Sequence, residues 1–252
     1  AVDTVEGRVE LPAHVAGERI ALRAHLRRTI AELEPDELWV DALPAGMWGE
    51  VDRGLVDEAL GDRPVHHLAR LVRWDPYRRA VGTDLPHFAR VCAVEPLHAD
   101  HEAALRSRAA QWSEVVLTDA PAPPAPPLPA GAWLVLHSGP TPETDDLVEH
   151  ARARRDRRAP GAPLVVATPS DGRCPRADVH LTGIVPAWPL LAAADHVVAG
   201  AGCNTVRQLS AAGTPADLVP MPRRWDDQFT RARRFRSALA GGSGATPGTP
   251  RT

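Results

Sequence analysis

The sequence contains no lysine, and all 29 of its basic residues are arginine. Schiff-base catalysis and the P-loop type of phosphate site both need a lysine amine, so both are excluded. The 32 acidic residues leave a formal net charge of −3. A chain with this balance has no general attraction for polyanions, and we therefore expect no nucleic acid among its partners.

Cysteine is also scarce, with three residues, Cys92, Cys174 and Cys203, spread over the chain without a Cys-x-x-Cys pair. This pattern favours reduced thiols over a disulfide framework. No apolar run reaches the ~18 residues that span a bilayer, and the first residues do not resemble a signal peptide. The sequence therefore predicts a soluble, cytoplasmic protein.

Proline is plentiful by contrast, with 26 residues, six of which fall between Asp119 and Pro129. Such a run cannot donate backbone hydrogen bonds to a sheet and favours polyproline II, so it acts as a semi-rigid spacer. A glycine-rich stretch that begins at Gly241 has little apolar surface to bury. We therefore expect a domain at 1–118, a proline-rich linker at 119–131, a domain at 132–240 and a disordered tail at 241–252.

Helical and extended patterns alternate in both halves of the chain. In the first half, the apolar periodicity predicts helices at 20–33, 57–60 and 98–111 and strands at 38–40, 65–72, 90–94 and 114–117. In the second half, it predicts strands at 133–136, 164–167, 179–184, 196–199 and 218–220 and helices at 141–155, 188–194, 205–212 and 226–239. The alternation indicates an α/β fold with two Rossmann-like domains, in which ligands bind at the carboxyl ends of the strands.

The turn after the strand at 133–136 leads directly into a helix. The Ser138 hydroxyl and the Gly139 N–H could bind phosphate there, because a helix start combines free N–H groups with a positive dipole end. Pro140 and Pro142 lack N–H groups, which weakens such a site. The alternative is an ordinary strand-to-helix turn capped by Thr141.

A second turn, after the strand at 196–199, also opens a helix. Gly200 and Gly202 leave room for a ligand beside the backbone, and Asn204 or Thr205 can cap the helix. The motif begins Gly-x-Gly but continues to a threonine, so the dinucleotide-binding fingerprint is incomplete.

A third turn, after the strand at 218–220, ends on Asp227 and Gln228. These two side chains offer carboxylate and amide acceptors together with an amide donor, which suits a polyhydroxyl ligand. A helix start capped by Asp226 is the alternative interpretation.

Four segments in order carry a family resemblance: 134–139, 181–186, 193–206 and 213–232. The most specific part is Ala-Asp-x-Val-Val-x-x-Ala-Gly-x-x-Thr, followed by Gly-x-Pro, Val-Pro and Asp-Gln. Together they resemble the nucleotide-sugar-binding half of GT-B-fold glycosyltransferases, in the group of the MurG-type and UDP-glycosyltransferase-like enzymes (the C-terminal domain of glycosyltransferase family 28). The resemblance implies a hexosyltransferase that moves a sugar from a nucleotide-diphosphate donor, typically UDP-linked, to a hydroxyl acceptor, without a metal or other cofactor.

The same resemblance assigns a nucleotide-sugar site residue by residue. It implies diphosphate contacts from the two strand-to-helix turns, base contacts from the backbone at 184–185 and sugar contacts from the Asp-Gln pair. The family commonly has an acidic residue at the position of Gln208, where it binds the ribose hydroxyls, and an amide pairs with a diol less strongly. The site implied comprises Ser138, Gly139, Ile184, Val185, Gly200, Gly202, Cys203, Asn204, Thr205, Gln208, Asp227 and Gln228.

The first half resembles the family less, and mainly over 37–50. The opening β-α-β unit, with its Gly-x-x-Gly-His turn, is missing, so we expect the natural protein to carry further residues before Ala1. That turn holds a frequent candidate for the general base, and the resemblance therefore leaves the catalytic residue unknown. Asp41, Glu50 and His137 could deprotonate an acceptor, although a structural role is the alternative for each.

Other functions stay open at this point. The chain could be a non-catalytic nucleotide-sugar-binding protein, or one half of a split enzyme completed by a partner chain. A nucleotide-sugar epimerase of the same architecture and an unrelated α/β module are the further alternatives.

Two clusters of chemistry-bearing side chains favour structural roles. His66, His67, His98 and His101 include a pair at i, i+3, but no cysteine or acid-rich segment joins them, so we expect no metal site. The basic run 152–158 lies at the end of a predicted helix, where positive charge offsets the dipole. Peripheral contact with the inner face of an anionic membrane is the alternative for this run.

Overall fold

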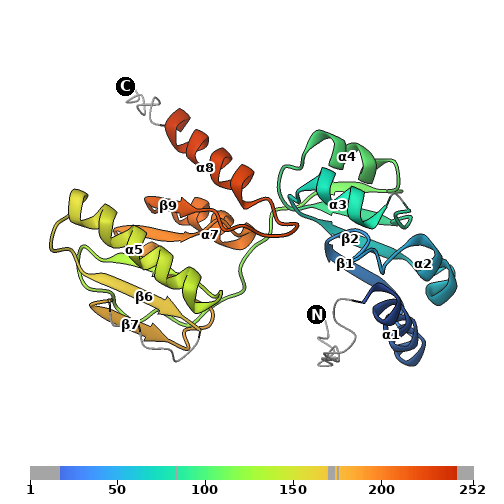
Figure 1. Ribbon diagram of the computed structural model, residues 1–252, viewed down its shortest axis with the longest axis horizontal. Helices are drawn as coiled ribbons and strands as arrows, with labels where there is room; N and C mark the ends of the chain where they lie inside the picture. Colours follow the sequence, from blue (N-terminus) through green and yellow to red (C-terminus); the bar gives the residue numbers. More distant parts are fainter. Residues whose placement is uncertain (1–17, 83, 170–173, 175, 243–252) are drawn as a thin grey trace, which may run out of the picture. The chain divides into compact units, whose positions relative to one another are not determined.

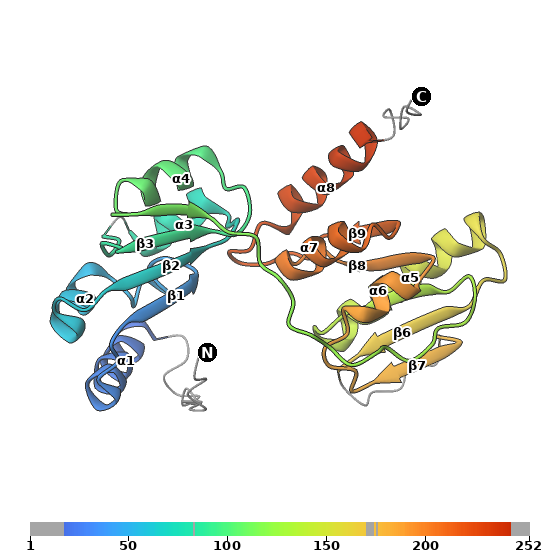
Figure 2. The same cartoon turned by 180° about the vertical axis from the view of Figure 1, so that it is seen from behind.

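The computed structural model describes residues 18–82, 84–169, 174 and 176–242. The chain divides after Leu117 into two compact units, each with its own parallel sheet (Figures 1 and 2). The expected tail lies outside the described residues from 243 onward, and its first two residues end the last helix. Among the described helices, none has the length and apolar character needed to cross a bilayer.

The first unit contains a four-stranded sheet with the strands in sequence order. Its strands are β1 (Leu38–Ala42), β2 (Val65–Ala69), β3 (Arg90–Ala93) and β4 (Trp112–Glu114), all parallel. Its helices are α1 (Arg19–Leu33), α2 (Arg53–Leu60), α3 (Trp74–Val81) and α4 (Ala99–Arg106).

Several elements of the first unit differ from the sequence prediction. Helix α3 is not among the predicted helices, although Trp74, Tyr77 and Val81 are buried at the spacing of one helix face. Its Pro76 stands in the first turn, where a missing N–H costs nothing. Helix α4 ends at Arg106, earlier than predicted, and β4 correspondingly begins at Trp112 rather than at Glu114.

Two histidines are completely buried in the first unit. His67 stacks on Phe88 with ring centroids 5.2 Å apart, and its Nδ1 donates to the Val40 carbonyl at 2.8 Å. His101 stacks on Trp74 at 4.3 Å. Burial lowers the pKa of His67 to about 4 and that of His101 to about 3, so both rings are neutral at pH 7. Within the described chain, no group of three or more His, Cys, Asp or Glu residues could hold a metal ion.

The second unit contains a five-stranded parallel sheet in the order β7-β6-β5-β8-β9. The strands are β5 (Trp133–Leu136), β6 (Leu164–Thr168), β7 (Val179–Thr182), β8 (His196–Gly200) and β9 (Ala216–Val219). The order changes direction at β5, which pairs with β6 on one side and with β8 on the other. In an open α/β sheet this switch point is where ligands bind.

Helices cover both faces of the second sheet (Figures 1 and 2). They are α5 (Thr141–Arg158), α6 (Pro189–Ala193), α7 (Cys203–Ala212) and α8 (Gln228–Gly242). Alternate side chains of each central strand enter two separate apolar clusters, one of which includes residues of α5 and the other residues of α6, α7 and α8. Burial on both faces explains why these strands are short uninterrupted apolar runs, which made them recognisable in the sequence.

Candidate functional site

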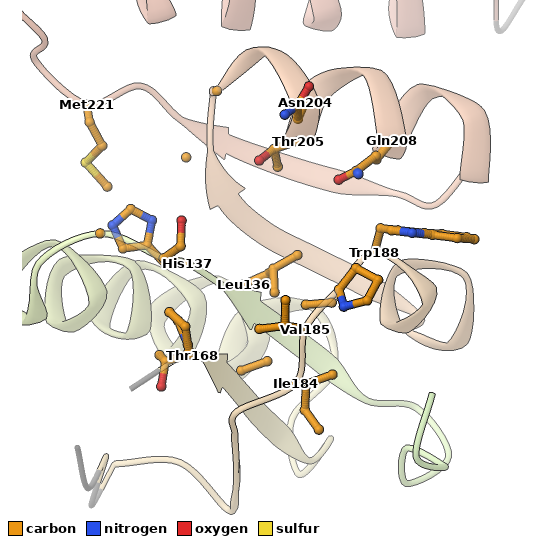
Figure 3. A pocket seen from close by; sticks show the side chains of 18 of the residues that line it. Leu136, His137, Thr168, Ile184, Val185, Trp188, Asn204, Thr205, Gln208 and Met221 are labelled. Carbon is orange, nitrogen blue, oxygen red and sulfur yellow. The ribbon is translucent and has the colours of Figure 1, made fainter. Parts of the chain in front are cut away.

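A cavity of about 570 Å³ opens at the carboxyl ends of β5, β6 and β8 (Figure 3). These strands end level with one another, because Leu136 pairs with both Ala167 and Ala199. The wall therefore consists of the turns that follow neighbouring strands. The lining residues are Leu136, His137, Ser138, Gly139, Ala167, Thr168, Pro169, Ile184, Val185, Pro186, Ala187, Trp188, Gly200, Gly202, Asn204, Thr205, Gln208, Met221, Arg223 and Gln228.

Ten of the twelve residues assigned from the sequence line this cavity. The two others, Cys203 and Asp227, do not. Cys203 begins α7, and the Asp227 carboxylate accepts the Thr230 N–H at 3.0 Å at the start of α8. The cap of α8 is thus Asp227 and not Asp226, which instead pairs with Arg231.

The start of α7 faces the cavity without a side-chain cap. Gly202 is the capping residue, and it has no side chain with which to cap the first turn. The prediction that Asn204 or Thr205 caps this helix is therefore wrong, because both lie inside its first turn. Their N–H groups precede the first intrahelical donor, that of Val206, and are available to a ligand together with the positive end of the helix dipole.

A chain of three charged or polar side chains closes another part of the wall. His137 Nε2 lies 2.9 Å from a carboxylate oxygen of Glu143, and the same carboxylate holds the Arg223 guanidinium through two bonds, one of 2.6 Å. The bonds from Arg223 lower the pKa of Glu143 to about 2, with a smaller contribution from His137, while partial burial opposes the shift. Glu143 is therefore ionised at neutral pH.

Two glycines lie next to the side chains of His137 and Glu143. A Cβ atom added at Gly139 would stand 2.7 Å from a Glu143 carboxylate oxygen and closer still to His137 Nε2. At Gly200, an added Cβ would contact the opposite edge of the same imidazole, 3.8 Å from Nδ1. The ring therefore fills the space between the ends of β5 and β8.

Gln208 lines the cavity and also holds the proline-rich segment. Its amide nitrogen donates to Asp119 at 2.7 Å, and Arg207 binds both oxygens of the same carboxylate, at 2.6 and 2.8 Å. The bonds from Arg207 lower the pKa of Asp119 below its ordinary value. Because the amide nitrogen is engaged, the Gln208 oxygen is the atom left to accept bonds from a ligand.

This contact gives a physical reason for an amide at position 208. We expect Gln208→Glu to destabilise the protein by about 1–2 kcal/mol, because two carboxylates would then face each other. Urea unfolding of Gln208→Glu, Asp119→Asn and the double variant measures this effect. The double variant should recover most of the loss, and additive losses would contradict the explanation.

Gln228 has a structural contact of its own. Its side-chain oxygen accepts the Met221 N–H at 2.9 Å, and the residue is buried. The amide nitrogen is the remaining donor of this side chain toward a ligand.

The other candidate bases lie in the first unit and are held by local contacts. Glu50 accepts the N–H groups of Met47 and Trp48 at 2.9 and 2.7 Å, and Asp41 forms a bidentate pair with Arg70. Of the three candidates, His137 is the one that lines the cavity.

Some lining residues were not assigned from the sequence: Thr168, Trp188, Met221 and Arg223 are examples. Thr168 ends β6 and Arg223 follows β9, so the rule that sites lie at strand ends could have included both. Trp188 follows the segment at 184–185, and its aromatic character was the available signal.

No protein-family model matches the sequence, and no curated protein matches it at the level of sequence. Solved structures do match the fold. The spinosyn rhamnosyltransferase SpnG, in complex with thymidine diphosphate, is 20% identical, with a TM-score of 0.57 over 90% of this chain. Arabidopsis thaliana UGT89C1, in complex with UDP-L-rhamnose, is 12% identical, with a TM-score of 0.56 over 95% of the chain.

The chain has the GT-B fold. The predicted α/β class with two Rossmann-like domains is thereby confirmed. The chain spans 64% of the length of SpnG and 67% of that of UGT89C1. A UDP-GlcNAc 2-epimerase from Neisseria meningitidis, bound to UDP-GlcNAc, also shares the fold, with 11% identity and a TM-score of 0.50 over 89% of this chain and 74% of its own.

Proposed function

We propose that the cavity of the second unit binds a nucleoside diphosphate sugar and that the protein transfers the sugar to a hydroxyl acceptor. The observation that carries this proposal is the uncapped start of α7, which opens on the cavity. No described residue of the lining is acidic, and the Glu143 carboxylate behind His137 is neutralised by its pair with Arg223. Such a wall suits a ligand with negative charge.

The cavity offers a distinct surface for each part of such a donor. The N–H groups of Asn204 and Thr205, with Ser138 and Gly139, would hold the diphosphate. Ile184, Val185 and Trp188 form an apolar surface that suits a nucleobase. The Gln208 oxygen would accept from a ribose hydroxyl, and the Gln228 amide nitrogen would contact the transferred sugar.

The chemistry that this arrangement favours is displacement at the anomeric carbon. The acceptor hydroxyl oxygen would form the new bond to the anomeric carbon while the bond from that carbon to the diphosphate oxygen breaks. The electron pair of the broken bond would stay on the leaving phosphate oxygen, and the hydroxyl proton would pass to water. Peptide N–H groups at a helix start are aimed at that developing charge before the reaction begins, so they stabilise it without reorganisation.

Calorimetric titration with UDP, TDP and their sugar conjugates tests the binding step. We expect measurable affinity for one nucleoside diphosphate series, since likeness to proteins in complex with thymidine diphosphate and UDP-L-rhamnose leaves the base open. Absence of heat with every nucleotide would remove the proposal. Release of the free nucleoside diphosphate on addition of an acceptor alcohol would distinguish a transferase from a binding protein.

We also propose that donor binding needs no divalent cation. The described lining residues provide no carboxylate ligand, which Mg²⁺ and Mn²⁺ prefer, and the helix start supplies the positive potential instead. Donor affinity should therefore change less than about twofold in excess EDTA. A loss of tenfold or more that added Mg²⁺ restores would contradict this proposal.

The likeness to a 2-epimerase supports a second candidate function at the same site. An epimerase would convert UDP-GlcNAc with no acceptor present, with exchange of the C2 proton for solvent deuterium. A transferase would leave the sugar configuration unchanged in that experiment, so proton NMR of the donor separates the two functions.

A further inference from the structure

His137 is an ionisable side chain of the cavity wall. One of its ring nitrogens, Nε2, contacts Glu143, and the other is Nδ1. It follows β5 directly and precedes the start of α5 by four residues. On its other side it lies against Gly200, two residues before the capping residue of α7. The imidazole therefore stands beside both helix starts that face the cavity.

The contacts of the ring decide which nitrogen can respond to a ligand. The ionised Glu143 carboxylate can only accept hydrogen bonds, so Nε2 must carry a proton and donate it. Nδ1 has no hydrogen-bond partner among the described residues. The edge bearing Nδ1 faces Gly200, which carries no side chain, and both residues line the cavity.

Arg223 forms an ion pair with Glu143, the residue that contacts His137. Its two terminal nitrogens hold the two oxygens of Glu143, so the guanidinium neutralises that carboxylate and leaves the imidazole to respond to a new charge.

We infer that His137 is a phosphate-binding cation: Nδ1 takes a proton from solvent as a nucleoside diphosphate enters and donates it in a hydrogen bond to a phosphate oxygen. This inference rests on the proposed function. It assigns to His137 a role that requires the protonated ring, opposite to the unprotonated ring that a general base requires.

The other charged groups around the ring keep one charge across the relevant pH range. Glu143, from α5, and Arg223, from the segment after β9, face His137, and Asp226 acts on Arg223. The remaining lining groups from β6, β8 and α7 are neutral, including Thr168, Gly200 and Thr205. Histidine is the side-chain type that can gain or lose a charge near neutral pH, and His137 is the histidine of this wall.

The test is the pH dependence of UDP and TDP affinity in the full chain. For the unchanged protein, affinity should fall roughly tenfold from pH 6.5 to 8.5, because a charge-assisted hydrogen bond is lost. His137→Gln should bind weakly at pH 6.5 and show little further change with pH. His150→Gln, an exposed histidine of α5, is the matched control and should behave as the unchanged protein.

Affinity that stays constant or rises with pH in the unchanged protein would overturn the role of His137, and this readout does not depend on the folding of a variant. Trp188→Ala provides a reference, since loss of a base contact should weaken binding by the same factor at every pH. Failure of the unchanged protein to bind any nucleotide would instead contradict the proposed function. The two failures are therefore distinguishable.

Discussion

Asn204→Asp is expected to weaken diphosphate binding about a hundredfold while it stabilises the protein. Asn204 is an exposed residue in the first turn of α7, at the edge of the cavity. A negative charge there interacts favourably with the helix dipole, by about 0.3–1 kcal/mol. If a bound phosphate lay about 5 Å from this charge, the repulsion would cost roughly 3 kcal/mol at an effective dielectric constant of about 20, which is about a hundredfold in affinity.

The opposite signs of these two effects make the result difficult to explain by unfolding. Calorimetry with UDP and TDP gives the affinity, and thermal unfolding gives the stability. Asn204→Ala, which adds no charge, should keep most of the affinity. Ser210→Asp places the same charge in the second half of α7 and should leave binding nearly unchanged. Equal affinities of Asn204→Asp and Asn204→Ala would show that the helix start does not contact the ligand.

Mild acid is expected to destabilise the first unit through its buried histidines. The folded rings of His67 and His101 have lowered pKa values of about 4 and about 3, whereas the unfolded chain binds a proton near the ordinary value of 6.5. The contribution of the two neutral rings to the free energy of unfolding is complete above pH 6.5. It is lost as the pH falls toward 4, by about 1.4 kcal/mol per pH unit for each ring. Between pH 7 and 4.5, each of the two histidines should lower the free energy of unfolding by roughly 2–3 kcal/mol.

Hydrogen exchange of peptides from residues 18–117, measured in the full chain at increasing urea, follows this unit separately. His101→Phe keeps an aromatic ring against Trp74 but removes the titration, so its stability should fall less between pH 7 and 4.5. His87→Gln changes an exposed histidine and serves as the control. If His101→Phe and the unchanged protein lose the same stability, another group is responsible for the acid sensitivity.

The sequence was most informative where local pattern and packing agree. The second sheet could be predicted because its central strands are buried on both faces, as in the run from His196 to Gly200. The turns after β5 and β8 were recognisable for the same reason, since glycines follow buried strands at both points. Helix α3 was missed although Trp74, Tyr77 and Val81 have the spacing of one helix face, and although a first-turn proline such as Pro76 is tolerated.

Contacts between distant residues account for what the sequence did not predict. Glu143 and Arg223 are 80 residues apart, and Gln208 and Asp119 are 89 apart. Each residue alone fits an ordinary surface role, and only the folded chain brings the two partners together. The His137–Glu143–Arg223 chain and the contact that explains an amide at position 208 therefore required the structure.

All side chains that line the cavity belong to the second unit, whose apolar clusters are formed by its own residues. If the cavity binds a nucleotide as proposed, substitutions that alter the preference for one nucleotide can accumulate without repacking the four-stranded sheet. During divergence, selection on such a ligand would act on positions of the second unit, so the packing of the first unit would be inherited intact.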